Sequence, residues 1–105
     1  MFARGVTIRL KPNSVAEFNR TLENEILPLL KKQQGFRGEN TLISSSGSEV
    51  LGISLWAEKE DAEAYNRTAY PEVQKLLARV SEKTTQVKTY EVFSSTINKT
   101  AARGA

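Results

Sequence analysis

The chain of 105 residues contains neither cysteine nor histidine. Without cysteine it can form no disulfide, no thiol nucleophile and no zinc–thiolate site. Without histidine it lacks the usual general base near neutral pH and the commonest protein ligand of metals and haem. Ser-His-Asp and Cys-His catalysis are therefore excluded, as is haem binding through a proximal histidine.

Long apolar runs are absent as well. No stretch of about 18 apolar residues occurs, so we expect no membrane-spanning helix. Residues 1–5 lead into a strand pattern without the apolar region of a signal peptide, which favours a cytoplasmic protein. The net charge of +3, from 15 basic and 12 acidic side chains, is too small and scattered to indicate nucleic-acid binding.

The length and composition are those of one small globular domain. We expect this domain to cover residues 1–95 and to be followed by a polar, flexible C-terminal tail over residues 96–105. A domain of this size buries only about 60–65% of the surface that its unfolded chain exposes. A further interface would therefore add to its stability.

Apolar periodicity predicts the order strand, helix, strand, strand, helix, strand. Alternation at Val6, Ile8 and Leu10 predicts the first strand. A long helix is expected to begin after Ser14 and to end near Gly35, with Pro28 bending it or splitting off its last turn. Two strands over residues 40–45 and 49–56 follow, joined by a turn of serine and glycine.

The second half of the chain repeats this plan. A helix follows Trp56, and Pro71 is expected in the first turn of another helical segment. The last strand is predicted over residues 87–93. Two strand–helix–strand units of similar length predict an α+β, ferredoxin-like βαββαβ fold, with a four-stranded antiparallel sheet and helices on one face.

Helices can cover only one face of such a sheet. The third strand carries apolar or small residues on both faces, so we expect both faces to be covered. We predict that the uncovered face packs against a second copy, which gives a homodimer with face-to-face sheets, a dimeric α+β barrel. The residues expected on that face are Thr7, Arg9, Gly52, Ser54 and Trp56.

Four segments resemble the antibiotic biosynthesis monooxygenase (ABM) family of the dimeric α+β barrel superfamily. The resemblance covers roughly residues 6–93, at positions that mainly carry the fold. Its segments are Lys31-Lys32-Gln33-Gln34-Gly35-Phe36, Ile53-Ser54-Leu55-Trp56, Glu60-Asp61-Ala62-Glu63-Ala64-Tyr65 and Val87-Lys88-Thr89-Tyr90-Glu91-Val92.

The resemblance implies several functions. The family includes enzymes that oxidise polyphenols or quinols with oxygen and no metal or flavin, haem-degrading relatives, and proteins with no known activity. The haem-degrading branch uses an asparagine, a tryptophan and a histidine. Here Trp56 resembles that tryptophan, but histidine is missing and Thr7 or Arg9 stands where the asparagine is expected. The cofactor-free branch is similar through Trp56 and through Tyr65 or Tyr70.

Five residues are candidates for a pocket between sheet and helices, and none is assigned as catalytic: Arg9, Ser54, Trp56, Tyr65 and Tyr70. Trp56 could stack on an aromatic substrate, or fill the core or the dimer seam. Tyr65 and Tyr70 could orient a phenol, or pack with their hydroxyls at the surface. Arg9 could stabilise a phenolate or superoxide, or pair across the dimer with Glu39 or Glu91. These two acids could serve as a base, although a surface position is the simpler expectation.

Two further classes of site are not expected. The acids at positions 58, 60, 61 and 63 lack the spacing of a calcium loop and suit the start of a helix. RNA-recognition domains of this fold place two aromatic residues on the third strand, whereas residues 49–56 carry one aromatic residue and no arginine or lysine. We therefore predict no metal, no cofactor and no nucleic acid.

Two functions remain. The first is a cofactor-independent monooxygenase acting on a small phenolic or quinol-like compound. The alternative is a non-catalytic dimeric protein of the same fold that binds a small apolar ligand or has a structural role.

Overall fold

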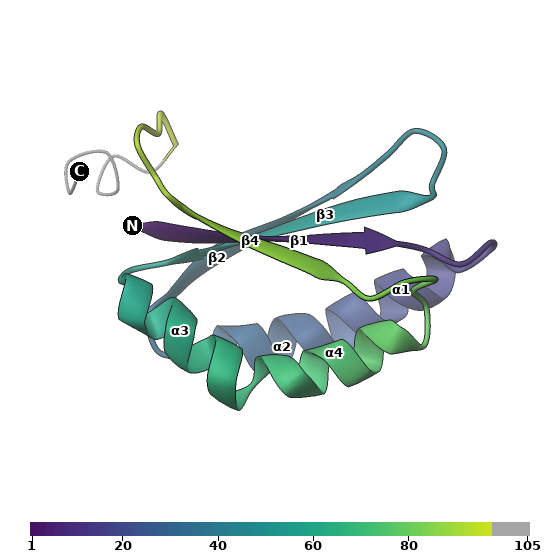
Figure 1. Cartoon of the computed structure of the whole chain (residues 1–105), viewed down its shortest axis with the longest axis horizontal. Coiled ribbons are helices and arrows are strands. Elements are labelled where there is room, and N and C mark those ends of the chain that lie inside the picture. Colours follow the sequence, from purple (N-terminus) through teal and green to yellow (C-terminus); the bar gives the residue numbers. More distant parts are fainter. Residues whose placement is uncertain (98–105) are drawn as a thin grey trace.

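Four strands form one antiparallel sheet in the order β2-β3-β1-β4 (Figure 1). The computed structural model describes residues 1–97. The strands are β1 (Phe2–Arg9), β2 (Phe36–Ile43), β3 (Glu49–Trp56) and β4 (Gln86–Glu91). With the helices between them they make the ferredoxin-like βαββαβ plan, so the predicted fold class is confirmed. Face-to-face pairing of two sheets stays a prediction, as does the domain boundary; residues 98–105 of the predicted tail lie outside the described residues.

The first helical segment is interrupted by one π-helical stretch. It consists of α1 (Val15–Thr21), the π-helix η1 (Leu22–Ile26) and α2 (Leu27–Lys31). Pro28 stands in the first turn of α2 and has no N–H to donate. The wider π-helical turn directly before the proline allows the helix to continue, although the proline donates no backbone hydrogen bond. The predicted split at this proline therefore takes the form of a change in helix type.

Gly35 lies in the turn between α2, which ends at Lys31, and β2, and has a φ of 80°. Glycine adopts this left-handed conformation without steric cost. A Cβ at this position would also collide with the side chain of Asp61. Both constraints favour glycine at the point where the chain turns from α2 into β2.

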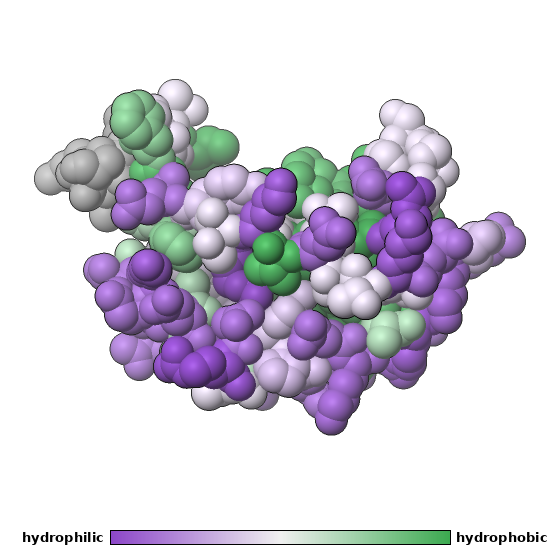
Figure 2. Space-filling model, viewed as in Figure 1, coloured by the Kyte–Doolittle hydropathy of each residue, from purple (hydrophilic) through white to green (hydrophobic). Residues whose placement is uncertain are grey.

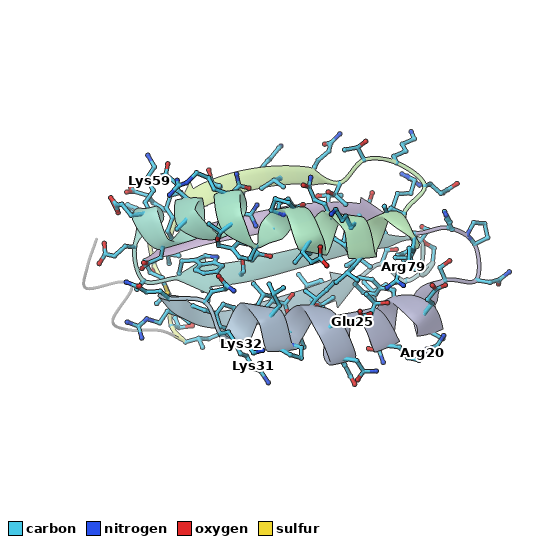
Figure 3. All side chains as sticks on the ribbon, turned by 90° about the horizontal axis from the view of Figure 1, so that it is seen from below. Arg20, Glu25, Lys31, Lys32, Lys59 and Arg79 are labelled. Atoms are coloured by element: carbon cyan, nitrogen blue, oxygen red, sulfur yellow. The ribbon has the colours of Figure 1, made fainter. Side chains whose placement is uncertain are left out.

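The second helical segment consists of α3 (Lys59–Thr68) and α4 (Tyr70–Ala78). Pro71 lies in the first turn of α4, as predicted. Glu25 of η1 and Arg79 after α4 face each other across the helix layer, with 3.3 Å between Oε2 and the guanidinium (Figure 3). Because both side chains are about half exposed, this pair adds no more than about 1 kcal/mol. None of the helices in residues 1–97 is long and apolar enough to cross a membrane.

The helices cover one face of the sheet, here called the inner face (Figure 1). The register pairs Val6 with Gly52 and Ile8 with Val50. Residues directly opposite each other in an antiparallel pair project to the same face. The prediction that Gly52, Ser54 and Trp56 lie on the uncovered face is therefore wrong. These residues share the inner face with Val6 and Ile8, and Trp56 is fully buried there.

The opposite face, here called the outer face, is largely apolar and open. Leu51 lies opposite Leu42 on one side and Thr7 on the other, and Tyr90 lies opposite Ala3. Leu42 and Tyr90 are each 53% exposed. Figure 2 shows hydrophobic residues along this upper side of the molecule, whereas hydrophilic residues dominate the helix side below. Within residues 1–97, no helix covers the outer face.

Candidate functional site

Three polar residues form one row across the inner face. Ser54 of β3 pairs with Arg4 of β1 on one side and with Glu39 of β2 on the other. Neighbouring strands lie about 4.8 Å apart, so the backbones of Arg4 and Glu39 are separated by about 10 Å. The row therefore places a cation and a carboxylate on either side of a serine, under the helices.

Arg4 is the buried cation of this row. Its side chain is only 2% exposed, and its guanidinium carbon lies 5.0 Å from the ring centre of Tyr65 and 4.4 Å from that of Tyr70. One guanidinium N–H group donates to Asn66 Oδ1 at 2.8 Å. Within residues 1–97, no carboxylate lies within 4.0 Å of the guanidinium.

Burial lowers the pKa of Arg4, and the neighbouring Tyr65 and Tyr70 partly offset that effect. An arginine nevertheless stays protonated in proteins. Within residues 1–97, no carboxylate therefore balances this positive charge beneath α3 and α4. Such a charge is costly unless something else balances it.

An aromatic chain connects the sheet to these two helices. The ring of Phe36 meets Trp56 edge-on with centroids 5.6 Å apart, and Trp56 stacks on Tyr65 at 4.9 Å. Tyr65 lies 5.9 Å from Tyr70. The Trp56 indole donates to Ser54 Oγ at 2.9 Å, so the one polar atom of this buried ring is satisfied.

The two tyrosines differ in their hydroxyl environments. The Tyr70 hydroxyl lies 3.0 Å from the hydroxyl of Thr85. Burial raises the pKa of Tyr65 to about 12, although the positive charge of Arg4 works in the opposite direction. Tyr65 is therefore protonated at neutral pH, and it can donate a hydrogen bond but cannot act as a base.

Glu39 is the half-buried carboxylate at the other end of the row. Its Oε2 accepts a hydrogen bond from the Thr41 hydroxyl at 2.7 Å. Burial raises the pKa of Glu39, and the bond from Thr41 partly counteracts this. A carboxylate with a raised pKa is a stronger base than an exposed one.

These groups surround a narrow cavity of about 50 Å³ between sheet and helices. Its polar end is formed by Arg4, Glu39, Thr41, Ser54, Tyr65 and Tyr70, and most of the remaining wall is aliphatic. The volume suffices for a few water molecules, whereas sites for drug-sized ligands measure about 300–1,000 Å³. A polycyclic occupant would require the walls to move.

A second hollow, of about 420 Å³, lies between α3 and β4. Arg4 lines this hollow too, together with Asn66, Arg67 and Thr89. The Arg4 side chain therefore stands between a narrow inner cavity and a wider outer one.

The predicted pocket residues are distributed unevenly. Ser54, Tyr65 and Tyr70 line the inner cavity, while Trp56 stacks on Tyr65 and does not line it. Arg9 lies on the outer face, where its guanidinium is 3.7 Å from Glu49. It therefore does not face the inner cavity. Within one chain it pairs with Glu49, and a pair with Glu39 or Glu91 across a dimer stays a prediction.

Arg4 was missed because the first strand was expected to begin at Val6. Arg4 lies two residues before Val6 and four before Ile8. Extending the strand alternation back to Arg4 would therefore have placed it on the inner face. Glu39 was named as a possible base, but a surface position was the simpler expectation. Its inward position depends on an irregularity between Phe36 and Gly38 that the apolar pattern does not encode.

Among residues 1–97, no group of three or more acidic side chains could hold a metal ion. What the site offers instead is one buried cation, one half-buried carboxylate and two tyrosine rings around an apolar slot. This set can bind a small group that carries negative charge or an acidic hydroxyl.

Comparison with solved structures shows the same fold in several antibiotic biosynthesis monooxygenases. A monooxygenase from the ActVA-Orf6 gene of Streptomyces coelicolor, solved with the ligand nanaomycin D, has a TM-score of 0.76 and 12% sequence identity, over 90% of this chain and 88% of that chain. SnoaB, a cofactor-independent oxygenase from Streptomyces nogalater, solved in a mutant form, has a TM-score of 0.74 and 13% identity, over 92% and 97%.

The same fold occurs in a protein of unknown function from Nitrosomonas europaea. It has a TM-score of 0.75 and 16% identity, over 92% of this chain and 93% of that chain. No protein-family model and no curated protein sequence matches the chain. At these identities the likeness establishes the fold, which agrees with the fold that the sequence resemblance implies.

Proposed function

We propose that the protein is a cofactor-independent monooxygenase of the ABM type that acts on a small phenolic or quinol-like compound. The observation that carries this proposal is the buried Arg4 guanidinium, which lies against two tyrosine rings and has no carboxylate partner within residues 1–97. A bound phenolate would supply the missing negative charge. The fold shared with SnoaB, which is itself described as a cofactor-independent oxygenase, supports the reaction class.

The reaction balances without an external reductant. A phenol with a hydrogen at the ring carbon opposite its hydroxyl reacts with one O2 to give a quinone and one water. The substrate supplies all four electrons: one oxygen atom becomes the new carbonyl, and the other leaves as water with the two hydrogens. The protein therefore has to bind the phenol, favour its anion and stabilise the charge that passes to oxygen.

Arg4 takes the role that Arg9 was expected to play. Its guanidinium can stabilise the phenolate and the superoxide that forms when an electron passes to oxygen. Tyr65, protonated at neutral pH, can donate a hydrogen bond to the same oxygen. Trp56 acts one layer further out, since its stacking fixes the position of the Tyr65 ring.

A homodimer forms part of this proposal. Packing a second sheet on the outer face would bury Leu42, Leu51 and Tyr90, which the single chain leaves exposed. Exposed apolar surface of this kind is typical of an interaction site. A second copy provides a surface of matching shape and polarity.

A second candidate function is a non-catalytic protein that binds a small ligand. The small volume of the inner cavity favours it, because about 50 Å³ leaves little room for both a substrate and oxygen. In this function Arg4 would bind the anionic group of a ligand and no oxygen would be consumed.

Turnover separates the two functions. We expect dithranol and naphthols with a hydrogen at the carbon opposite the hydroxyl, incubated with the protein under air, to give quinone absorbance together with oxygen uptake. The Arg4→Met variant should lower kcat/KM by about 10²–10³, the usual cost of removing one oxyanion-stabilising group. Arg9→Met is the matched control on the outer face and should retain wild-type rates. No turnover across the panel, with a ligand detected by native mass spectrometry, would favour the binding protein.

A further inference from the structure

Glu39 is the one carboxylate that lines the inner cavity within residues 1–97. We infer that Glu39 is the general base that removes the hydroxyl proton of the substrate, and that the substrates are compounds with a free phenolic or enolic hydroxyl. The inference rests on the proposed function and assigns the proton-transfer step within it.

The backbone of β2 directs this carboxylate inward. Phe36 lies opposite Trp56, and Gly38 lies opposite Leu55, so Arg37 is an extra residue in the ladder. A bulge of this kind shifts the alternation by one residue, so Phe36 and Glu39 both project to the inner face. Without the bulge, a strand that buried Phe36 would turn Glu39 outward.

The carboxylate is held in place with one oxygen available. Oε2 accepts the Thr41 hydroxyl at 2.7 Å, which fixes the orientation of the group. Gly52 lies beneath it, and a Cβ added there would be 3.5 Å from Oε2. Because Gly52 has no side chain, the space beside the carboxylate is left to the cavity. Within residues 1–97, Oε1 accepts no hydrogen bond, so it can receive a proton from a ligand.

The charged and titratable groups around the cavity suit a proton transfer from an oxygen acid. Those that line it besides Glu39 are Arg4 on β1, Tyr65 on α3 and Tyr70 on α4. Burial raises the pKa of Glu39, and this reduces the difference between its pKa and that of a phenol, which is about 10. Arg4, on the other side of Ser54, reduces this pKa difference further, because it stabilises the phenolate and so lowers the pKa of the phenol.

The step conserves charge within the site. The substrate O–H bond breaks, its proton bonds to a Glu39 carboxylate oxygen, and the electron pair stays on the substrate oxygen beside the Arg4 guanidinium. Glu39 becomes neutral while the substrate becomes an anion, so the net charge of the cavity does not change. A methyl ether of the same substrate has no proton to transfer and should be neither ionised nor oxidised.

The test is the pH dependence of kcat/KM for wild type, Glu39→Gln and the control Glu49→Gln, whose carboxylate lies on the outer face. Wild type and control should gain activity as the pH rises through the raised pKa of Glu39. In Glu39→Gln this rise of activity with pH should be absent. Its kcat/KM near neutral pH should be lower by about 10²–10⁴. The loss should shrink for more acidic phenols and above a pH of about 10, where the phenol is already ionised in solution.

The alternative outcomes separate this inference from the proposed function. If wild type turns over but the loss in Glu39→Gln is absent, or equal at every pH and for every phenol, Glu39 is not the base and the monooxygenase proposal stands. If wild type converts none of the phenols, both fail. Should circular dichroism show that Glu39→Gln is unfolded, Glu39→Asp replaces it. This variant should be slower but should keep the rise of activity with pH, and a slower variant without that rise would overturn the inference.

Discussion

The two faces of the sheet use the same four strands for opposite purposes. The inner face, covered by helices, holds the polar row of Arg4, Ser54 and Glu39. The outer face, open in the single chain, displays Leu51 and Tyr90. A monomer that served only its own stability would reverse this distribution. The difference is the basis for both proposals: a ligand with a polar group on the inner face and a second sheet on the outer face.

The largest effect is expected from a substitution that disrupts the predicted dimer contact on the outer face. Leu51 is central in the sheet and 37% exposed. In a face-to-face dimer, Leu51→Asp would bury an unpaired carboxylate, at a cost of about 3–5 kcal/mol. We expect light scattering at micromolar concentration to give a dimer for wild type and a monomer for Leu51→Asp.

Val15→Asp is the matched control for this substitution. Val15 is an apolar residue of similar exposure, 43%, but it lies on α1, away from the outer face. This variant should stay dimeric. A wild-type monomer, or a Leu51→Asp protein that remains a dimer, would remove the outer face from consideration as the homodimer interface.

The next effect sharpens the description of the inner face. Burial raises the pKa of Tyr65 to about 12, against an ordinary value of about 10 in the unfolded chain. The folded state therefore keeps this proton while the unfolded state loses it. The stability that results is fully present below pH 10 and falls between pH 10 and 12, by about 2–3 kcal/mol in all.

Urea unfolding between pH 9 and 12 measures this decline. Tyr65→Phe should reduce the decline by about 2–3 kcal/mol relative to wild type, since it removes the titrating hydroxyl. Parallel profiles for wild type and Tyr65→Phe would mean that the buried ring does not resist ionisation in this way.

The difference between the faces also explains how much the sequence could predict. The order of elements and the ferredoxin-like fold follow from apolar periodicity, from Gly35 and from two of the three prolines, Pro28 and Pro71, because each of these acts locally. The division of β3 into two sets of alternating residues could be predicted as well. It could not be predicted which of these two sets of β3 residues faces the helices. Both sets contain apolar or small residues, and only the pairing of β3 with β1 decides between them.

The candidate site was predictable only in part, for two physical reasons. Tyr65 and Tyr70 stand on helices whose inner side is marked by their apolar neighbours. Along β1, Arg4 is a charged residue that precedes the alternating apolar residues Val6 and Ile8. A charged residue at such a position is usually taken as the end of a strand. Glu39 depends on a bulge, which arises from the pairing of β2 with β3 and leaves no mark in the periodicity.

The smallest expected effect concerns Arg9, at the margin of the outer face. Its guanidinium lies 3.7 Å from Glu49, and the two side chains are 49% and 51% exposed. An exposed pair of this kind contributes less than about 1 kcal/mol and is screened by salt. Arg9→Gln should therefore lower the free energy of unfolding by less than about 1 kcal/mol in urea, and 1 M salt should abolish the difference. Because removing one partner of a buried pair costs about 3–5 kcal/mol, a loss of that size that persists in salt would show that a partner sheet covers Arg9 as well as Leu51.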